Sequence, residues 1–193
     1  HGPLSNELAP TIPTAVERLA VTTAAEMETA MLSHLAQANW IIMAAAVADV
    51  RPSHTATGKL PKKDLPNPLP LSFVPDIVAQ LSAKKSPQQL IIGFAAQTGD
   101  IIPPAKEKLH RKQLNAIVAN PIDQPDSGFG SANNQAVILL ANHHQRDKAE
   151  PNAQAGPHPA VHRADISAIQ VPQGSKLTLA HKLYDSLLGS DWT

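Results

Sequence analysis

The sequence predicts a single α/β domain built on a mostly parallel sheet, and three observations support that fold class. Three segments, 41–47, 90–96 and 114–120, are largely apolar, as is typical of strands covered on both faces. Segments of helical length lie between them, at the spacing of strand–helix–strand units. The chain has 193 residues. We therefore expect residues 1–193 to form one domain, which at this size buries about 70% of its unfolded surface.

The composition excludes several classes of function. Sixteen basic and sixteen acidic residues cancel, so the chain has no global field that attracts nucleic acid or an anionic membrane. The absence of cysteine excludes a disulfide framework, thiolate metal ligands and a cysteine nucleophile, and it suits a reducing cytoplasm. No apolar run approaches the roughly 18 residues of a membrane span. We expect a cytoplasmic protein without nucleic-acid or membrane partners.

The chain begins at His1-Gly2-Pro3, without an initiating Met, and we interpret it as a fragment whose upstream sequence is missing. Targeting segments would lie upstream, so the sequence says nothing about them. Residues 1–15 are rich in Pro and Ser and are expected to be irregular.

The first predicted elements form a βαβ unit. A short strand is expected over 16–21 and a helix over 24–38, which Thr23 and Glu26 begin as a capping box. The apolar face of this helix repeats every three or four residues, at Met27, Met31, Leu35 and Ala38. The strand over 41–47 completes the unit, which is right-handed by strong precedent.

The middle of the chain continues this alternation. Residues 65–74 alternate prolines with apolar residues, which predicts an extended segment at a sheet edge: a partner-binding surface or simply a surface ribbon. Pro75 is expected at the first position of a helix with Asp76 in its first turn, and its buried face comprises Ile77, Val78 and Leu81. A strand over 90–96, a basic helix over 105–113 and a strand over 114–120, stopped by Pro121, follow.

The last third is less regular. A turn is expected at 128–131 and a strand at 136–140, before a segment over 142–163 that has almost no large apolar residue and is predicted to be a mobile loop. A strand over 166–171 then leads to a final helix that Ser175 caps. The apolar side of that helix comprises Leu179, Leu183, Leu187 and Leu188.

Polar and small residues at the ends of three predicted strands indicate a ligand site. In open parallel sheets, ligands bind outside the carboxyl ends of the strands, and small residues let them approach the backbone closely. Lysines of the 59–63 loop and of the 105–113 helix supply positive charge for a phosphorylated ligand. Asp49 or Asp76 could hold Mg²⁺, which prefers one or two carboxylates together with phosphate oxygens. The alternative is that these lysines are simply solvated, and their spacing alone does not decide.

Other kinds of site are not indicated. Of the nine histidines, five lie in or near the 142–163 segment with no acid at ligand spacing, so no histidine-based metal site is expected. The sequence contains no GxSxG, Walker lysine loop or GxGxxG. A glycine loop for phosphate, if one exists, lies upstream of His1.

Six motifs, taken together, are more specific than any one of them. AAAVADVRP, a GKLPKK loop, VPDIV, IIGFAAQT, KLHRKQLNAIVAN and GFGSANN follow one another in this order. Together they resemble the phosphopantothenate–cysteine ligase domain of bacterial coenzyme A biosynthesis, from His1 to about Asn134 and more loosely to the last helix. In that family a flavin-dependent phosphopantothenoylcysteine decarboxylase domain usually precedes the ligase domain in one bifunctional chain.

The resemblance implies a fold and a reaction. The fold is a Rossmann-like three-layer domain with a mostly parallel sheet, and an extended edge or flap segment, here 65–74, joins two copies into a homodimer. The reaction activates 4′-phosphopantothenate with CTP: its carboxylate attacks the α-phosphate, giving an acyl-cytidylate and pyrophosphate, and the amine of cysteine then displaces CMP. Mg²⁺ assists by neutralising the phosphates. FMN, and a higher oligomer, are implied only if a decarboxylase domain precedes the chain.

The resemblance also assigns roles to residues. Lys59 matches the flap lysine that forms the acyl-cytidylate, and Lys62 is its companion. The positions that match nucleotide-binding residues, besides Lys59, are Ala45, Ala46, Asp49, Asp76, Phe94, Ala95, Lys108, Lys112 and Gln113. Asp49 is also the expected metal ligand.

Two departures and two rival functions accompany this interpretation. The loop reads KLPKK where many relatives have KxKK, and Ala132 stands where an Asp is common. The family's first strand and its Gly-rich turn lie upstream of His1, so the fragment itself is expected to be inactive in the full reaction. The rivals are a non-catalytic nucleotide-binding or dimerisation module on the same fold, and a nicotinamide- or flavin-dependent reductase.

Overall fold

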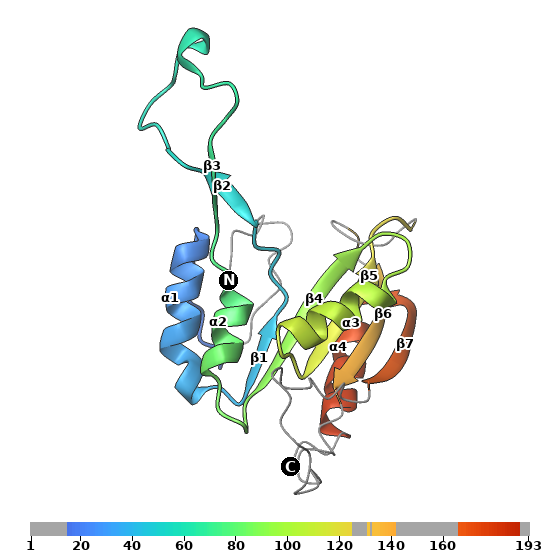
Figure 1. Ribbon diagram of the computed structural model, residues 1–193. Coiled ribbons are helices and arrows are strands. Elements are labelled where there is room, and N and C mark those ends of the chain that lie inside the picture. Colours follow the sequence, from blue (N-terminus) through green and yellow to red (C-terminus); the bar gives the residue numbers. More distant parts are fainter. Residues whose placement is uncertain (1–14, 125–130, 132, 142–165, 190–193) are drawn as a thin grey trace, which may run out of the picture.

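The computed structural model describes residues 15–124, 131, 133–141 and 166–189, and it shows a five-stranded sheet between helices (Figure 1). In spatial order the strands are β1 (Trp40–Met43), β4 (Leu90–Gln97), β5 (Ala116–Pro121), β6 (Asn133–Ala141) and β7 (Ile166–Ser175). The helices are α1 (Ala24–His34), α2 (Ile77–Lys84), α3 (Ile102–Arg111) and α4 (Lys176–Leu188), with a 3₁₀ turn at Leu35–Gln37. The predicted three-layer α/β class is confirmed.

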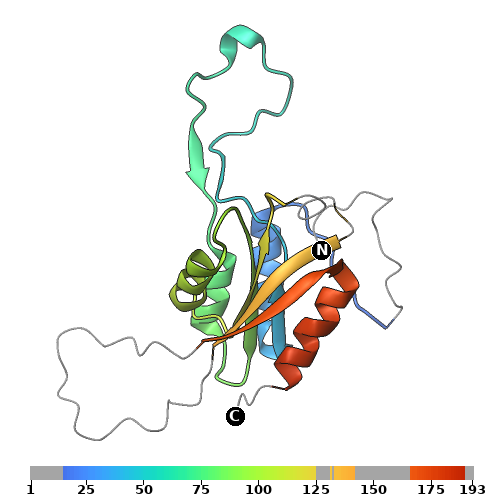
Figure 2. The ribbon, with the colours of Figure 1, turned by 90° about the vertical axis from the view of Figure 1, so that its right-hand side faces the viewer.

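Strand direction decides which loops share an edge of the sheet. β1, β4 and β5 are parallel, whereas β6 is antiparallel to both β5 and β7. β7 therefore runs in the same direction as β1, β4 and β5, and the start of α4 lies at the edge where those strands end (Figure 2). This edge carries the carboxyl ends that were expected to bind a ligand.

The two faces of the sheet bury separate apolar clusters. Side chains alternate along each strand, so Ile117 and Ala119 of β5 face α1, α2 and α3, while Ala116 and Val118 face α4. Leu81 of α2 and Leu109 of α3 belong to the first cluster. Leu179, Leu183 and Leu187, four residues apart along α4, belong to the second.

Three helices begin with side-chain caps. Thr23 and Glu26 form the predicted capping box of α1, and Ser175 accepts a hydrogen bond from the Thr178 N–H at the start of α4, as expected. The N–H groups of Thr22 and then Thr23 hydrogen-bond to the Glu26 carboxylate and lower its pKa. Asp76 caps α2 through the Ala79 N–H at 3.1 Å.

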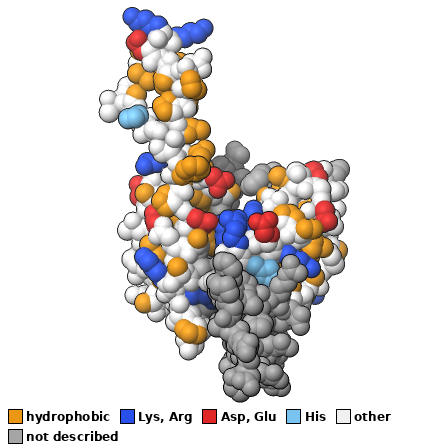
Figure 3. All heavy atoms as spheres, viewed as in Figure 1, with side chains coloured by type: hydrophobic (Ala, Val, Ile, Leu, Met, Phe, Trp, Pro, Cys, Tyr) orange, Lys and Arg blue, Asp and Glu red, His pale blue; other side chains and the backbone are white. Residues whose placement is uncertain are grey.

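A long arm, residues 50–74, projects from the edge where the parallel strands end (Figures 1 and 2). At its base, β2 (Val50–Pro52) pairs in antiparallel fashion with β3 (Leu71–Phe73), and η2 (Lys62–Asp64) lies near its far end. Large apolar side chains are exposed along it, with Phe73 at 88%, and Figure 3 shows them on the arm surface together with basic groups at its end. The extended segment predicted over 65–74 is thus a strand only at 71–73.

Several predicted boundaries are wrong. Residues 16–21 form no strand, and positions 15–20 are exposed. Within the described residues the main sheet ends at β1, so no strand is paired with this segment. The predicted βαβ unit over 16–47 is therefore absent. β1 ends at Met43, because the ladder to β4 stops there, and Ala44 to Ala46 are exposed.

Other differences concern prolines and the C-terminal leucines. α3 begins at Ile102 rather than at 105, with Pro103 and Pro104 in its first turn. Proline has no backbone N–H, and this costs nothing there because N–H groups in the first turn have no acceptor within the helix. Pro75 precedes the Asp76 cap, and Pro121 is the last residue of β5. Leu188 is 73% exposed because it follows the buried Leu187 and so lies about 100° around the helix.

The remaining strands extend beyond their predicted ranges. β6 and β7 are longer than 136–140 and 166–171, because they pair with each other from Asn133 to Ala141. The predicted loop over 142–163 and the predicted turn at 128–131, apart from Ser131, lie outside the described residues.

Candidate functional site

A pocket of about 720 Å³ lies where β1, β4 and β5 end. The chain leaves β1 as an irregular segment, 44–49, whose small side chains leave the backbone accessible. The end of β4 contributes residues on both faces: Phe94 is half-buried on the α4 side, and Ala95 is buried on the α2–α3 side. The pocket therefore wraps over the strand ends and reaches both layers of helices.

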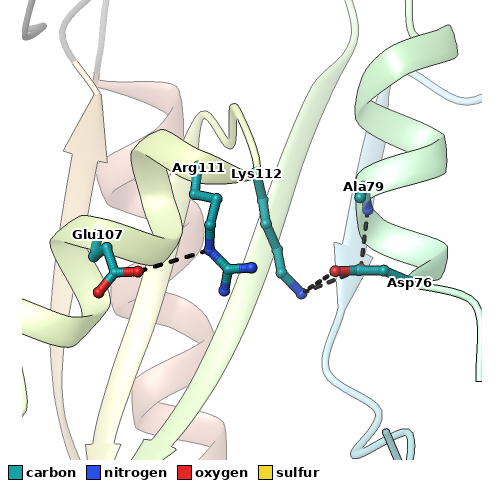
Figure 4. A network of polar contacts seen from close by, with 5 residues as sticks. All are labelled: Asp76, Ala79, Glu107, Arg111 and Lys112. Carbon is teal, nitrogen blue, oxygen red and sulfur yellow. Dashed lines mark hydrogen bonds and ion pairs between the residues drawn. The ribbon is translucent and has the colours of Figure 1, made fainter. Parts of the chain in front are cut away.

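The α2–α3 side of the pocket carries an ion pair. Lys112, just beyond the end of α3, places its Nζ 2.9 Å from Oδ2 and 3.1 Å from Oδ1 of Asp76 (Figure 4). Lys108 lies one turn earlier and also lines the pocket. Arg111 lies 3.8 Å from Glu107 and is exposed. Two ammonium groups thus border this side, one of them neutralised by a carboxylate.

The charge state of Asp76 follows from these contacts. Partial burial favours the neutral acid, but hydrogen bonds from Lys112 and the Ala79 N–H, with the attraction of Lys112 and Arg111, outweigh it. The pKa of Asp76 therefore lies below its ordinary value of 3.8. Asp76 is ionised at neutral pH and holds Lys112 at the pocket rim.

Removing this carboxylate should destabilise the fold moderately. We expect Asp76→Ala to lower the free energy of unfolding by about 1 kcal/mol through the lost helix cap. Asp76→Asn should cost less, because Asn also caps helices and the side chain of Asp76 is 42% exposed, so the ion pair adds little. Urea unfolding of the two variants at pH 7 measures both values.

The difference in the free energy of unfolding between wild type and Asp76→Ala should depend on pH with a definite sign. Because folding lowers the pKa of Asp76, its stabilisation is complete above the unfolded value of about 4 and is lost as the pH falls through the folded value. The gap between wild type and Asp76→Ala should therefore narrow below about pH 4. A gap that widened on acidification would contradict the observed contacts.

The pocket brings together most, but not all, of the residues expected from the sequence. Eight of them line it: Ala45, Ala46, Asp49, Asp76, Phe94, Ala95, Lys108 and Lys112. Gln113 does not line it and is exposed at the end of α3, where its φ of 50° makes the turn into β5. Lys59 and Lys62 lie on the arm, which leads away from the pocket (Figure 1).

Polar residues that the sequence interpretation missed also line the pocket, on the α4 side. Asn120 is the penultimate residue of β5, and Lys176 is the first residue of α4. Side chains alternate along a strand, so Asn120 lies on the same face of β5 as Val118, the face that α4 covers. This alternation could have identified Asn120 as a pocket residue. The position of Lys176 at the pocket depends on the direction of β7, which no sequence motif indicates.

The described residues offer few ligands for a metal ion of their own. Within 15–124, 131, 133–141 and 166–189, no three His, Asp or Glu side chains cluster in a way that could hold one. Among the residues that the structure describes, the carboxylates that line the pocket are those of Asp49 and Asp76. This donor set fits Mg²⁺ only when phosphate oxygens and water complete the shell. No helix in the described ranges is long and apolar enough to cross a membrane.

Comparison with known proteins identifies relatives. The family model described as "DNA/pantothenate metabolism flavoprotein C-terminal domain" matches residues 4–163. "Coenzyme A biosynthesis bifunctional protein CoaBC" of Escherichia coli (strain K12) is 41% identical over 125 residues, which are 63% of this chain and 31% of the relative. The protein of the same name from Bacillus subtilis (strain 168) is 37% identical over 131 residues, 68% of this chain and 32% of the relative. The chain spans about a third of the length of these relatives.

Solved structures agree on the fold. The C-terminal domain of a coenzyme A biosynthesis bifunctional protein CoaBC superposes with a TM-score of 0.65 at 24% identity, covering 96% of this chain and 69% of that one. The "DNA/Pantothenate Metabolism Flavoprotein from Streptococcus pneumoniae" gives 0.59 at 14% identity, covering 88% and 71%. At these identities the likeness concerns the fold alone.

Proposed function

Because this chain belongs to the DNA/pantothenate metabolism flavoprotein C-terminal domain family, we propose that it acts in coenzyme A biosynthesis as a phosphopantothenate–cysteine ligase. The substrates are CTP, 4′-phosphopantothenate and cysteine, and the products are 4′-phosphopantothenoylcysteine, CMP and pyrophosphate. One observation supports this above the others: residues from four separate segments that match the ligase motifs line a single pocket at the strand ends.

The first step of the proposed reaction needs charge neutralisation. The carboxylate of phosphopantothenate attacks the α-phosphorus of CTP, the bond to the β-phosphate breaks, and pyrophosphate leaves. Lys108 and Lys112 would hold phosphate oxygens, which requires Lys112 to exchange Asp76 for the nucleotide. Mg²⁺ would supply further charge neutralisation, with Asp49 as its protein ligand.

The second step is an acyl transfer. The neutral amine of cysteine attacks the acyl carbon, the carbon–oxygen bond to the cytidylate breaks, CMP leaves and the nitrogen loses a proton. Small, exposed side chains at 44–46 leave the backbone there accessible to the acyl group, and the buried Ala95 adds no bulk to the pocket wall. The pocket contributes mainly positioning, since holding the two reacting groups together removes much of the entropic barrier.

The arm would have two roles in the proposed reaction. Its exposed apolar residues, Phe73 and Leu71 foremost, would pack against a second copy of the chain in a homodimer. Lys59 would bind the triphosphate once the arm, or that of the second copy, covers a pocket. If a decarboxylase domain precedes these residues in the full-length protein, FMN and a higher oligomer come with it.

A second candidate is a nucleotide-binding or dimerisation module without catalysis. The placement of Lys59 and Lys62 on the arm, away from the pocket, favours it. Such a module would bind CTP and dimerise but release no pyrophosphate.

The test is pyrophosphate release by the full-length protein with CTP, Mg²⁺, 4′-phosphopantothenate and cysteine. We expect release that requires phosphopantothenate, and we expect Lys112→Gln to reduce it by about 10- to 100-fold, as for loss of a charge-assisted phosphate contact. Lys106→Gln is the matched control, because Lys106 lies on α3, is exposed and does not line the pocket. CTP binding without pyrophosphate release would favour the second candidate.

A further inference from the structure

The α4 side of the pocket carries a cation that the proposed residue roles leave unused. Lys176 lines the pocket at the first position of α4, and its side chain is exposed. Within the described ranges its ammonium group makes no hydrogen bond or ion pair. A lysine at a helix N-terminus is disfavoured by the helix dipole, since both are positive. The two together make a local positive potential that an anion would relieve.

A second, independent feature of the same side points to a ligand. Asn120 is only 9% exposed and lines the pocket, on the face of the sheet that α4 covers. No partner for its side-chain amide is found among the described residues. The amide is not one of the fully buried unpaired groups, so it is reached from the pocket and a bound polar group can hydrogen-bond to it there. The residue paired with it on β4, Ala96, is small and leaves access to the amide.

Topology places these two features at one edge. β5 and β7 run in the same direction, so the end of β5, with Asn120, and the start of α4, with Lys176, lie at the same edge of the sheet (Figure 2). Lys108 and Lys112 lie on the other face, with α3. The pocket thus has two cationic poles, one on each side of the strand ends.

We propose that Lys176, the N-terminus of α4 and Asn120 form a phosphate-binding subsite, separate from the one bordered by Lys108 and Lys112. This inference rests on the proposed function, which brings two phosphorylated substrates into one pocket. Like charges repel, so a triphosphate and a phosphate monoester bind together most readily when separate cations neutralise each of them. The phosphate in the subsite belongs either to CTP or to 4′-phosphopantothenate.

Binding of four compounds to the full-length protein tests the subsite and identifies the phosphate. Isothermal titration with CTP, cytidine, 4′-phosphopantothenate and pantothenate separates phosphate contacts from the rest of each ligand. Lys176→Gln should weaken one phosphorylated compound by about tenfold or more, the effect of a charge-assisted hydrogen bond, and leave its phosphate-free counterpart unchanged. Lys176→Arg should largely restore binding. Asn120→Leu should weaken the same compound, because it removes the amide that faces the pocket, and its melting temperature checks that the fold is intact.

Lys182→Gln is the matched control, because Lys182 is exposed on α4 and does not line the pocket. If Lys176→Gln loses affinity for CTP alone, the phosphate in the subsite belongs to the nucleotide. If it loses affinity for 4′-phosphopantothenate alone, the phosphate is that of the monoester. The subsite is wrong, while the ligase proposal stands, if Lys176→Gln binds both phosphorylated compounds as tightly as wild type does. The same holds if the substitution weakens binding of the phosphate-free compound as much as binding of its phosphorylated counterpart. If wild type binds neither CTP nor 4′-phosphopantothenate, the ligase proposal fails and the subsite with it.

Discussion

Lys59→Gln is expected to reduce pyrophosphate release by about 100-fold or more, the usual cost of losing a group that neutralises developing charge. The melting temperature should not change, because Lys59 is exposed on the arm and substitutions there contribute little to stability. The structure places Lys59 away from the pocket. The expected loss of activity therefore requires the arm to cover a pocket during turnover.

Two variants control this experiment. Lys84→Gln removes an exposed charge at the end of α2, outside the arm and the pocket, and should leave the rate within about twofold, as for most surface substitutions. Lys59→Arg keeps the positive charge and should recover part of the activity. Pyrophosphate release by Lys59→Gln within a few-fold of wild type would remove Lys59 from the mechanism.

The largest effect on stability is expected from Asn115→Ala, at about 2–4 kcal/mol in the free energy of unfolding. Asn115 is 3% exposed, and its Oδ1 accepts hydrogen bonds from the Ile91 N–H at 2.9 Å and from Lys85 Nζ at 2.8 Å. Its own N–H donates to the Ile91 carbonyl. The side chain thus pairs β4 with the segment before β5, one residue ahead of the ladder at Ile92 and Ala116. Truncation leaves a buried N–H and an ammonium without this acceptor.

Chemical denaturation of Asn115→Ala measures this cost. Asn39→Ala is the control, because Asn39 is exposed and lies just before β1, so a change within about 0.5 kcal/mol is expected. A difference between Asn115→Ala and wild type below about 0.5 kcal/mol would show that other groups replace the lost contacts.

Much of the fold could be predicted because periodicity reports burial. β4 is buried along most of its length and appears in the sequence as an uninterrupted apolar run, and α4 repeats its leucines every four residues. The strand expected at 16–21 failed because strand formation depends on a neighbouring strand, which local sequence does not specify. The helix predicted over 105–113 begins earlier, at Ile102, because prolines fit the first turn of a helix.

The site was only partly predictable for a similar reason. Strand ends and α3 follow one another along the chain, so the motifs identified Asp49, Phe94 and Lys108. Asn120 and Lys176 enter the pocket through the pairing of β5, β6 and β7, a long-range property. The arm leaves the domain through the pairing of β2 with β3, whereas the sequence predicts only an extended segment over 65–74.

The most direct measurement is a crystal structure of the full-length protein with CTP. We expect the nucleotide over the ends of β1 and β4, with a phosphate oxygen within hydrogen-bond distance of Lys108 or Lys112, and with Lys112 released from Asp76. A nucleotide bound away from these strand ends, or one that leaves the Lys112–Asp76 ion pair intact and touches neither lysine, would contradict it.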